Sequence, residues 1–130
     1  MTEKLFKEKY PIHMIEIAKS EMITNDMGAI TAHYIDKVEK HPVATYIGIF
    51  DHYAHTSSLT DSTIAEDILD AKNVMLCFGK ELTSPEVLAV RPRAIGIAEM
   101  KESFVISFLE APNPAANEAM INWTKALIRL

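Results

Sequence analysis

Hydrophobic and polar positions follow two different periods along the chain, and the changes of period mark its predicted elements. In residues 12–22, "IHMIEIAKSEM", side chains alternate between two sides at a period of two, which predicts a strand of moderate burial. The residues before it, 1–10, are mostly polar, so we expect a loose N-terminal arm there.

Residues 24–41 change to a helical period. Apolar side chains recur there at steps of three and four, at Met27, Ile30, Tyr34 and Val38. The pattern predicts an amphipathic helix that is capped by Thr24 or Asn25 and ended by His41-Pro42.

Two apolar runs follow, residues 43–50 and 73–78, and both are rich in β-branched or aromatic side chains. They predict buried strands. A loop rich in Ser and Thr and a short helix near residues 63–71 are expected between them. Residues 83–90 predict another brief helix, with Pro85 at its first position.

The last third of the chain predicts a hairpin and a second long helix. Residues 93–100 and 103–110 are strand-like and are separated by a short polar turn. In the closing helix Asn113 is the cap and Pro114 the first residue. The apolar stripe of this helix comprises Ala116, Met120, Trp123, Leu127 and Leu130.

These elements define the expected fold class. It is an α+β, two-layer sandwich in which an approximately five-stranded sheet packs against two long amphipathic helices, with short connecting helices, in one domain over residues 1–130. The central strands are apolar at almost every position, so both faces of the sheet should be covered. A symmetric homodimer is the expected cover for the second face.

Composition narrows the classes of function. The chain is 48% hydrophobic and 24% charged, as is usual for a globular protein, and its net charge of −5 disfavours nucleic-acid binding. Cys77 is the single cysteine, which excludes an intramolecular disulfide. The charged N-terminus lacks the apolar core of a signal peptide, and no apolar run reaches membrane-spanning length. A soluble cytoplasmic protein without a membrane partner is therefore expected.

Residues 43–111 resemble the family known as domain of unknown function 302. The resemblance is carried by Phe50-Asp51-His52 at a strand end, by "NVMLCFGKE", by the short helix "SPEVLAV", and by the hairpin "RPRAIGIAE" and "FVISFLEAP". It implies a small two-layer α+β domain that dimerises, and it implies no mechanism because that family is biochemically uncharacterised.

The sequence "FDHYAHT" (50–56) carries a candidate metal site. If the chain turns after the strand, Asp51, His52 and His55 could bind one transition metal and leave an open coordination position, with Cys77 or His33 as a further ligand. Noncovalent haem on His52 or His55 is a variant of this hypothesis. The alternative is a polar strand end in which His52 hydrogen-bonds the backbone, and the cofactor is unknown.

A second candidate site is cationic. Lys80, Arg91 and Arg93 lie near predicted strand ends and could hold a carboxylate or phosphate by charge-assisted hydrogen bonds. The alternative is a solvated loop whose cations pair with nearby acids.

Two functions follow. The first is a cytoplasmic homodimer that binds a small molecule or a protein without catalysis. The second is a metal- or haem-dependent, redox-related protein that uses Asp51, His52 and His55.

Overall fold

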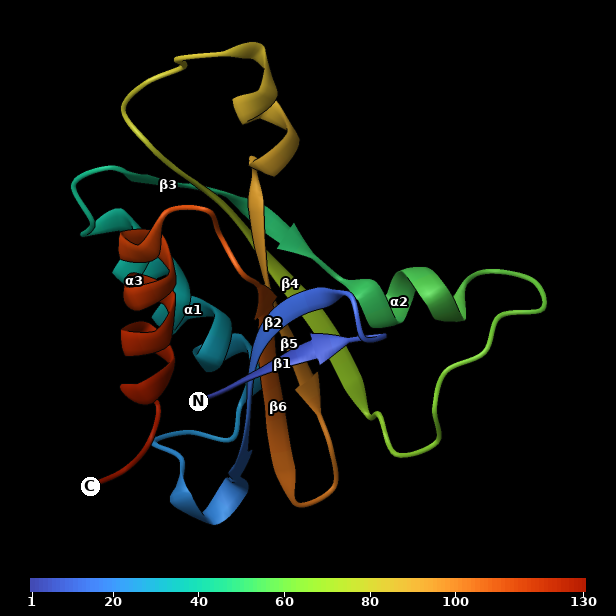
Figure 1. The fold of residues 1–130 in the computed structure, drawn as a ribbon. Coiled ribbons are helices and arrows are strands. Elements are labelled where there is room, and N and C mark those ends of the chain that lie inside the picture. The colour runs from blue at the N-terminus through green and yellow to red at the C-terminus, as the bar shows by residue number, and fades with distance from the viewer.

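The computed structural model describes residues 1–130, and six strands form one open antiparallel sheet in it (Figure 1). The strand order is β1-β2-β6-β5-β4-β3. The strands are β1 (Thr2–Phe6), β2 (Tyr10–Ala18), β3 (Ala44–Phe50), β4 (Asp70–Phe78), β5 (Arg93–Glu99) and β6 (Ser103–Leu109). The expectation of about five strands is therefore wrong, because the N-terminal segment contributes a sixth.

Strand β1 forms without an apolar side chain pattern. All five of its residues are exposed, and it pairs with β2 from Thr2 opposite Met14 to Phe6 opposite Tyr10. The turn between the two strands holds Lys7 and Glu8 at positive φ, 53° and 63°. Two successive residues at positive φ match the twist of a tight hairpin. The Asn or Gly residues that usually occupy such positions, and that make the turn recognisable in a sequence, are absent here. Main-chain pairing, which leaves no mark in the hydrophobic pattern, explains why this strand escaped prediction.

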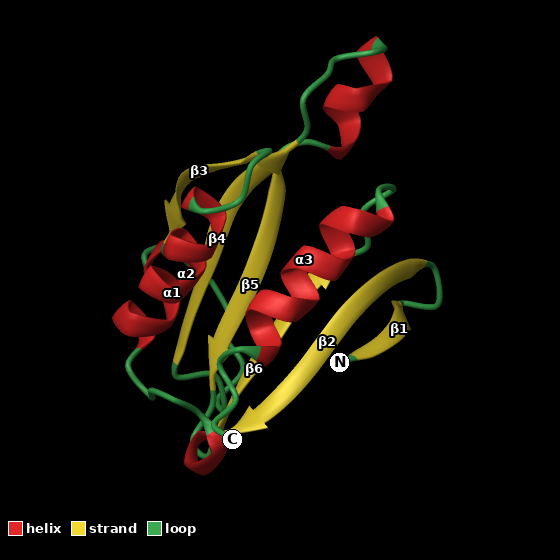
Figure 2. Ribbon diagram, turned by 90° about the vertical axis from the view of Figure 1, so that its left-hand side faces the viewer, coloured by secondary structure: helices red, strands yellow, loops and turns green.

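Three α-helices and two short 3-10 helices complete the fold. They are α1 (Met27–Glu39), α2 (His52–Ser57), α3 (Pro114–Lys125), η1 (Lys19–Glu21) and η2 (Pro85–Val90). Figures 1 and 2 show α1 and α3 side by side over one face of the sheet, while α2 lies beyond the other face. Asn113 caps α3 as predicted, whereas the cap of α1 is Asp26, one residue beyond the expected Asn25.

The core lies between the sheet and the helices α1 and α3. Tyr34 on α1 and Thr124 on α3 are fully buried and hydrogen-bonded to each other at 2.7 Å, so the two helices are joined inside the core. Each of the four strands β2, β6, β5 and β4 contributes alternate side chains to this face. They include Ile17, Phe104, Ile106, Phe108, Ile95, Ile97, Val74, Leu76 and Phe78.

The opposite side of the sheet, which we call the outer face, carries the intervening side chains. Many of them are small or half-buried, such as Ala94, Gly96, Ser107, Met75 and Cys77. Its exposed large side chains are Phe6, Tyr10, Ile47, Phe50 and Leu109. The expected short helix near residues 63–71 is absent, and residues 60–69 run as turns and loop from α2 back to β4. None of the helices combines the length and the hydrophobicity of a membrane-spanning segment.

Candidate functional site

A cavity of about 360 Å³ lies where β4 ends and the chain leaves the sheet toward η2. We call it the β4–β5 cavity. Its lining includes Ile47 from β3 and Cys77 from β4, and the other lining residues lie in the connection from β4 to β5. The remaining lining residues are Gly79, Lys80, Glu81, Leu82, Leu88, Arg91 and Pro92.

The position of Arg91 in this cavity is fixed by its contact with Gly79. Gly79 has a φ of +121°, which L side chains rarely adopt, and the guanidinium of Arg91 occupies the space that a Cβ at this position would need. Arg91 Nη1 also donates a hydrogen bond of 2.8 Å to the backbone carbonyl of Glu81. The guanidinium is thus held at the cavity by two residues of the turn after β4, Gly79 and Glu81.

Lys80 adds a second cation to the cavity. Neither Lys80 nor Arg91 takes part in an ion pair of the protein. Glu81 is the one acidic residue in the lining. The two cations are therefore available to a ligand, although solvent screens Lys80 because it is exposed.

Arg93, the third predicted ligand-binding residue, has a different environment. It is only 8% exposed and donates hydrogen bonds to the carbonyls of Val90 and Leu109. Burial lowers the pKa of its guanidinium. Arg93 lines two other cavities. The structure thus brings Lys80 and Arg91 together and assigns Arg93 to the contact between β6 and the end of η2.

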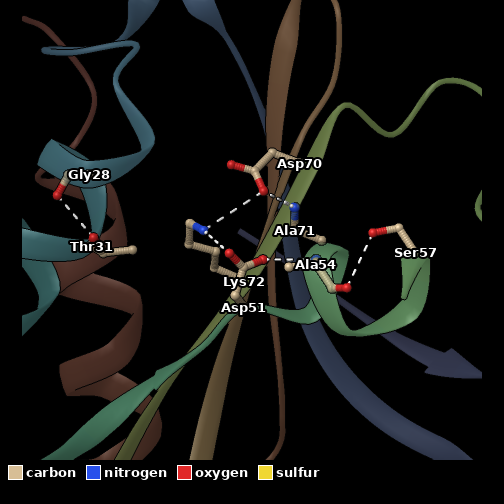
Figure 3. Close-up of polar contacts among 8 residues, drawn as sticks. All are labelled: Gly28, Thr31, Asp51, Ala54, Ser57, Asp70, Ala71 and Lys72. Atoms are coloured by element: carbon tan, nitrogen blue, oxygen red, sulfur yellow. Dashed lines mark hydrogen bonds and ion pairs between the residues drawn. The ribbon is translucent and has the colours of Figure 1, made fainter. Parts of the chain in front are cut away.

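Asp51 is the N-cap of α2, and its carboxylate lies next to Lys72 (Figure 3). Its carboxylate accepts a hydrogen bond from the amide of Ala54 at 3.0 Å and pairs with Lys72 Nζ at 2.8 Å. The hydrogen bond from Lys72, with a further one from Ala54, lowers the pKa of Asp51. The same contact raises the pKa of Lys72. Both carboxylate oxygens of Asp51 are engaged by nitrogen donors.

His52 and His55 lie on the next turn. His52 Nδ1 is 3.0 Å from the side-chain oxygen of Asn73, and both rings pack near Phe50, with centroid distances of 5.2 and 5.4 Å. The ligand atoms of Asp51, His52 and His55 do not all lie within 4.8 Å of one another. Metal or haem binding by these residues stays a prediction.

Sequence reasoning missed the apolar part of the β4–β5 cavity. Cys77 belongs to residues 73–78, which predict a buried strand, but it is half-buried on the outer face. Leu82 and Leu88 are exposed to solvent, just before and within the predicted brief helix of residues 83–90. A glycine directly after a buried strand was the available signal, because it marks a place where another group approaches the backbone closely.

The fold and this cavity define a small α+β protein with an open antiparallel sheet, covered by two long helices on one face only. The chain belongs to a family of unknown function (DUF6858), whose model matches residues 1–129. The resemblance to the domain of unknown function 302 is not confirmed. Comparison with curated proteins and with solved structures found no match.

Proposed function

We propose that this protein is a dimeric binding module for a small ligand with an apolar body and one carboxylate. The observation that carries this proposal is the guanidinium of Arg91, held against Gly79 and beside Lys80 in a cavity with apolar walls. In this proposal the guanidinium and the ammonium bind the carboxylate, while Ile47, Leu82 and Leu88 contact the apolar body.

The size and chemistry of the cavity support a ligand of this type. About 360 Å³ falls at the lower end of the range for small-molecule sites, roughly 300 to 1,000 Å³. A guanidinium presents several N–H donors in one plane, and Arg91 uses one donor for the carbonyl of Glu81. The remaining donors suit two oxygens of a planar carboxylate.

The outer face supports the dimeric part of the proposal. Five large apolar side chains are exposed there in two groups: Phe6, Tyr10 and Leu109 lie on β1, β2 and β6, and Ile47 and Phe50 lie on β3 at the opposite edge. Exposed apolar groups of this kind often mark a protein–protein contact. A second copy related by a two-fold axis would bury the same patch on both chains. Ile47 belongs both to this face and to the cavity, so a partner copy would lie next to the bound ligand.

A titration with saturated monocarboxylates from acetate to decanoate, followed by amide NMR, tests the ligand proposal. We expect shift changes in residues 77–92 and an affinity that rises with chain length, because each buried methylene contributes about 0.8 kcal/mol. Arg91→Gln should weaken binding about tenfold or more, as expected for loss of a hydrogen bond to a charged group.

Lys101→Gln is the matched control, since Lys101 is an exposed lysine in the β5–β6 turn. It should leave the titration unchanged. An affinity that is independent of chain length, or equal in the Arg91→Gln and control variants, would exclude this cavity as a carboxylate site.

A further inference from the structure

Three potential metal ligands meet near the β1 edge of the sheet, on the face that carries α1 and α3. They are Glu3 in β1, His13 in β2 and Glu110 directly after β6, and their ligand atoms all lie within 4.8 Å of one another. Strand register explains the meeting. Glu3 is paired with His13, His13 is paired with Phe108, and Glu110 follows Phe108 by two residues, so all these side chains point to the same face.

His13 is the unusual member of this group. It is only 8% exposed, and its Nε2 is the one buried side-chain polar atom of the protein that has no hydrogen-bond partner. The ring stacks on Phe108 with a centroid distance of 4.9 Å. A buried polar atom without a partner destabilises the folded state, so a ligand that binds Nε2 would recover stability.

Nε2 faces carboxylates that are near but not bonded to it. Its distance to Glu110 Oε1 is 3.9 Å, which is too long for a hydrogen bond. A proton on Nε2 could donate a well-aligned hydrogen bond to only one carboxylate oxygen at a time. A metal ion between the three groups would bind all of them at once.

We propose that Glu3, His13 and Glu110 form a binding site for a divalent transition metal ion, with Zn²⁺ as the representative species. Imidazole nitrogen and carboxylate oxygen are both regular zinc ligands, at about 2.0–2.2 Å from the ion. Two carboxylates with a neutral imidazole balance the two positive charges of the ion. Three protein ligands leave a fourth position for water.

The His13–Glu110 pair needs only a small movement to reach this geometry, and the ligand atom of Glu3 lies within 4.8 Å of both. Ligands around tetrahedral zinc lie roughly 3.3 to 3.5 Å apart, given the bond lengths above. The separation of 3.9 Å between His13 and Glu110 exceeds this range by about half an ångström. Rotation of the partly exposed glutamate side chains can supply that difference, while His13 remains fixed by its stacking on Phe108.

The site would join three segments of the sheet edge. Strand β1 is exposed along its whole length and has β2 as its single neighbour. An ion bound by Glu3 and Glu110 would add a link from β1 to the residue that follows β6. Metal binding should therefore stabilise the N-terminal strand more than any other strand.

Zinc titration of the full chain, purified without an affinity tag and treated with a chelator, tests the site. We expect one equivalent of Zn²⁺ to bind, to raise the midpoint of thermal unfolding, and to slow amide exchange in β1. The variant Glu3→Gln/Glu110→Gln should weaken binding at least 100-fold, about tenfold or more for each carboxylate. Glu8→Gln, a change at an exposed residue of the β1–β2 turn, is the matched control and should bind like the original protein.

His13→Gln adds an independent test, since it removes the nitrogen ligand and retains both carboxylates. It should abolish the zinc-dependent rise in the unfolding midpoint. Zinc binding that is unchanged in the double glutamine variant would place the ion elsewhere, for example on His52 and His55, and would overturn the proposal. Absence of binding to the original protein at 0.1 mM zinc, on the order of 10⁻⁴ M, would overturn it equally.

Discussion

At the scale of single residues, Gly79 connects the backbone to the proposed ligand site. Its positive φ ends β4, and its missing side chain lets the Arg91 guanidinium lie against the turn. Other residues at this position would strain the backbone and displace the arginine. One glycine thus supports both the local conformation and the position of the cation.

Gly79→Ala should destabilise the protein by about 1 to 2 kcal/mol, because alanine is strained at this φ and its Cβ collides with Arg91. It should also weaken carboxylate binding. Chemical denaturation and the monocarboxylate titration measure the two effects. Gly48→Ala is the matched control, since a Cβ at Gly48 meets nothing within 4 Å. Equal effects of the two substitutions would refute this role of Gly79.

Tyr34 is the buried residue whose ionisation should be visible in stability. Burial raises the pKa of its hydroxyl, outweighing the hydrogen bond to Thr124. Since the folded state holds this proton more tightly than the unfolded state, the stability is intact below pH 10 and falls as the pH rises above it. Between pH 10 and pH 11 the loss should be about 1 kcal/mol.

Tyr34→Phe isolates this effect. The variant should lower the free energy of unfolding by about 1 kcal/mol at pH 7, because the hydrogen bond to Thr124 is lost. It should not show the further loss of stability above pH 10 that the ionisation of Tyr34 causes. Denaturant unfolding of both proteins at pH 7, 10 and 11 measures the difference. Parallel pH profiles would show that Tyr34 keeps an ordinary pKa.

At the scale of elements, the short helix α2 depends on its N-cap residue. Asp51 caps α2 through Ala54 and is held ionised by Lys72, so its pKa lies below the ordinary value. This contribution to stability is present above the unfolded pKa, near 4, and is lost as the pH falls through the lower folded pKa.

The amide proton of Ala54 reports this titration directly. Its chemical shift should change below pH 4 in the original protein. In Lys72→Met the midpoint should move up toward the ordinary pKa of an aspartate, since the largest cause of the shift is removed. Lys101→Gln serves again as the control. Identical midpoints in all three proteins would argue against the Asp51–Lys72 pair.

The elements also show what a single sequence can reveal. The long helices and strands β2 to β6 could be predicted because their apolar residues recur at a helical period or form apolar runs of strand length. Strand β1 could not, since main-chain pairing and a turn with Lys7 and Glu8 at positive φ hold it.

The candidate sites were predictable to a similar degree. Lys80 and Arg91 were found because charge is visible in the sequence, whereas the cavity that they share depends on the path of the chain toward η2. The His-x-x-His spacing of His52 and His55 reflects a helical turn after the cap Asp51, with both rings near Phe50. Glu3 and Glu110 are more than a hundred positions apart, and only the register of three strands brings them to His13.

At the scale of the whole molecule, the sheet is covered unequally. Helices α1 and α3 cover one face (Figure 2). The outer face keeps large apolar side chains at its surface. The expectation of a homodimer came from the apolar central strands, and this asymmetry is a second argument for the proposal.

Leu109→Glu should convert the proposed dimer into a monomer, because a two-fold interface would bury the new charge twice without a partner. Light scattering after gel filtration measures the mass, with the expected values being that of two chains for the original protein and one for the variant. Ile23→Glu is the control, since Ile23 is exposed to a similar extent, 54% against 50%, but is not part of the sheet. A monomeric original protein would exclude the dimer.

The place of β2 in the strand order has a consequence for the way the chain folds. Strands β3 to β6 pair with neighbours in sequence, whereas β2 pairs with β6, and the contact of Glu16 with Ser103 joins residues 87 positions apart. Closing a loop of that length costs roughly 3 kcal/mol more than closing a short hairpin. Strands β3 to β6 should therefore assemble first, and β2 should join late and bring β1 with it. During synthesis on the ribosome, β1 and β2 could join the sheet only after β6 has been made, when most of the chain has been synthesised.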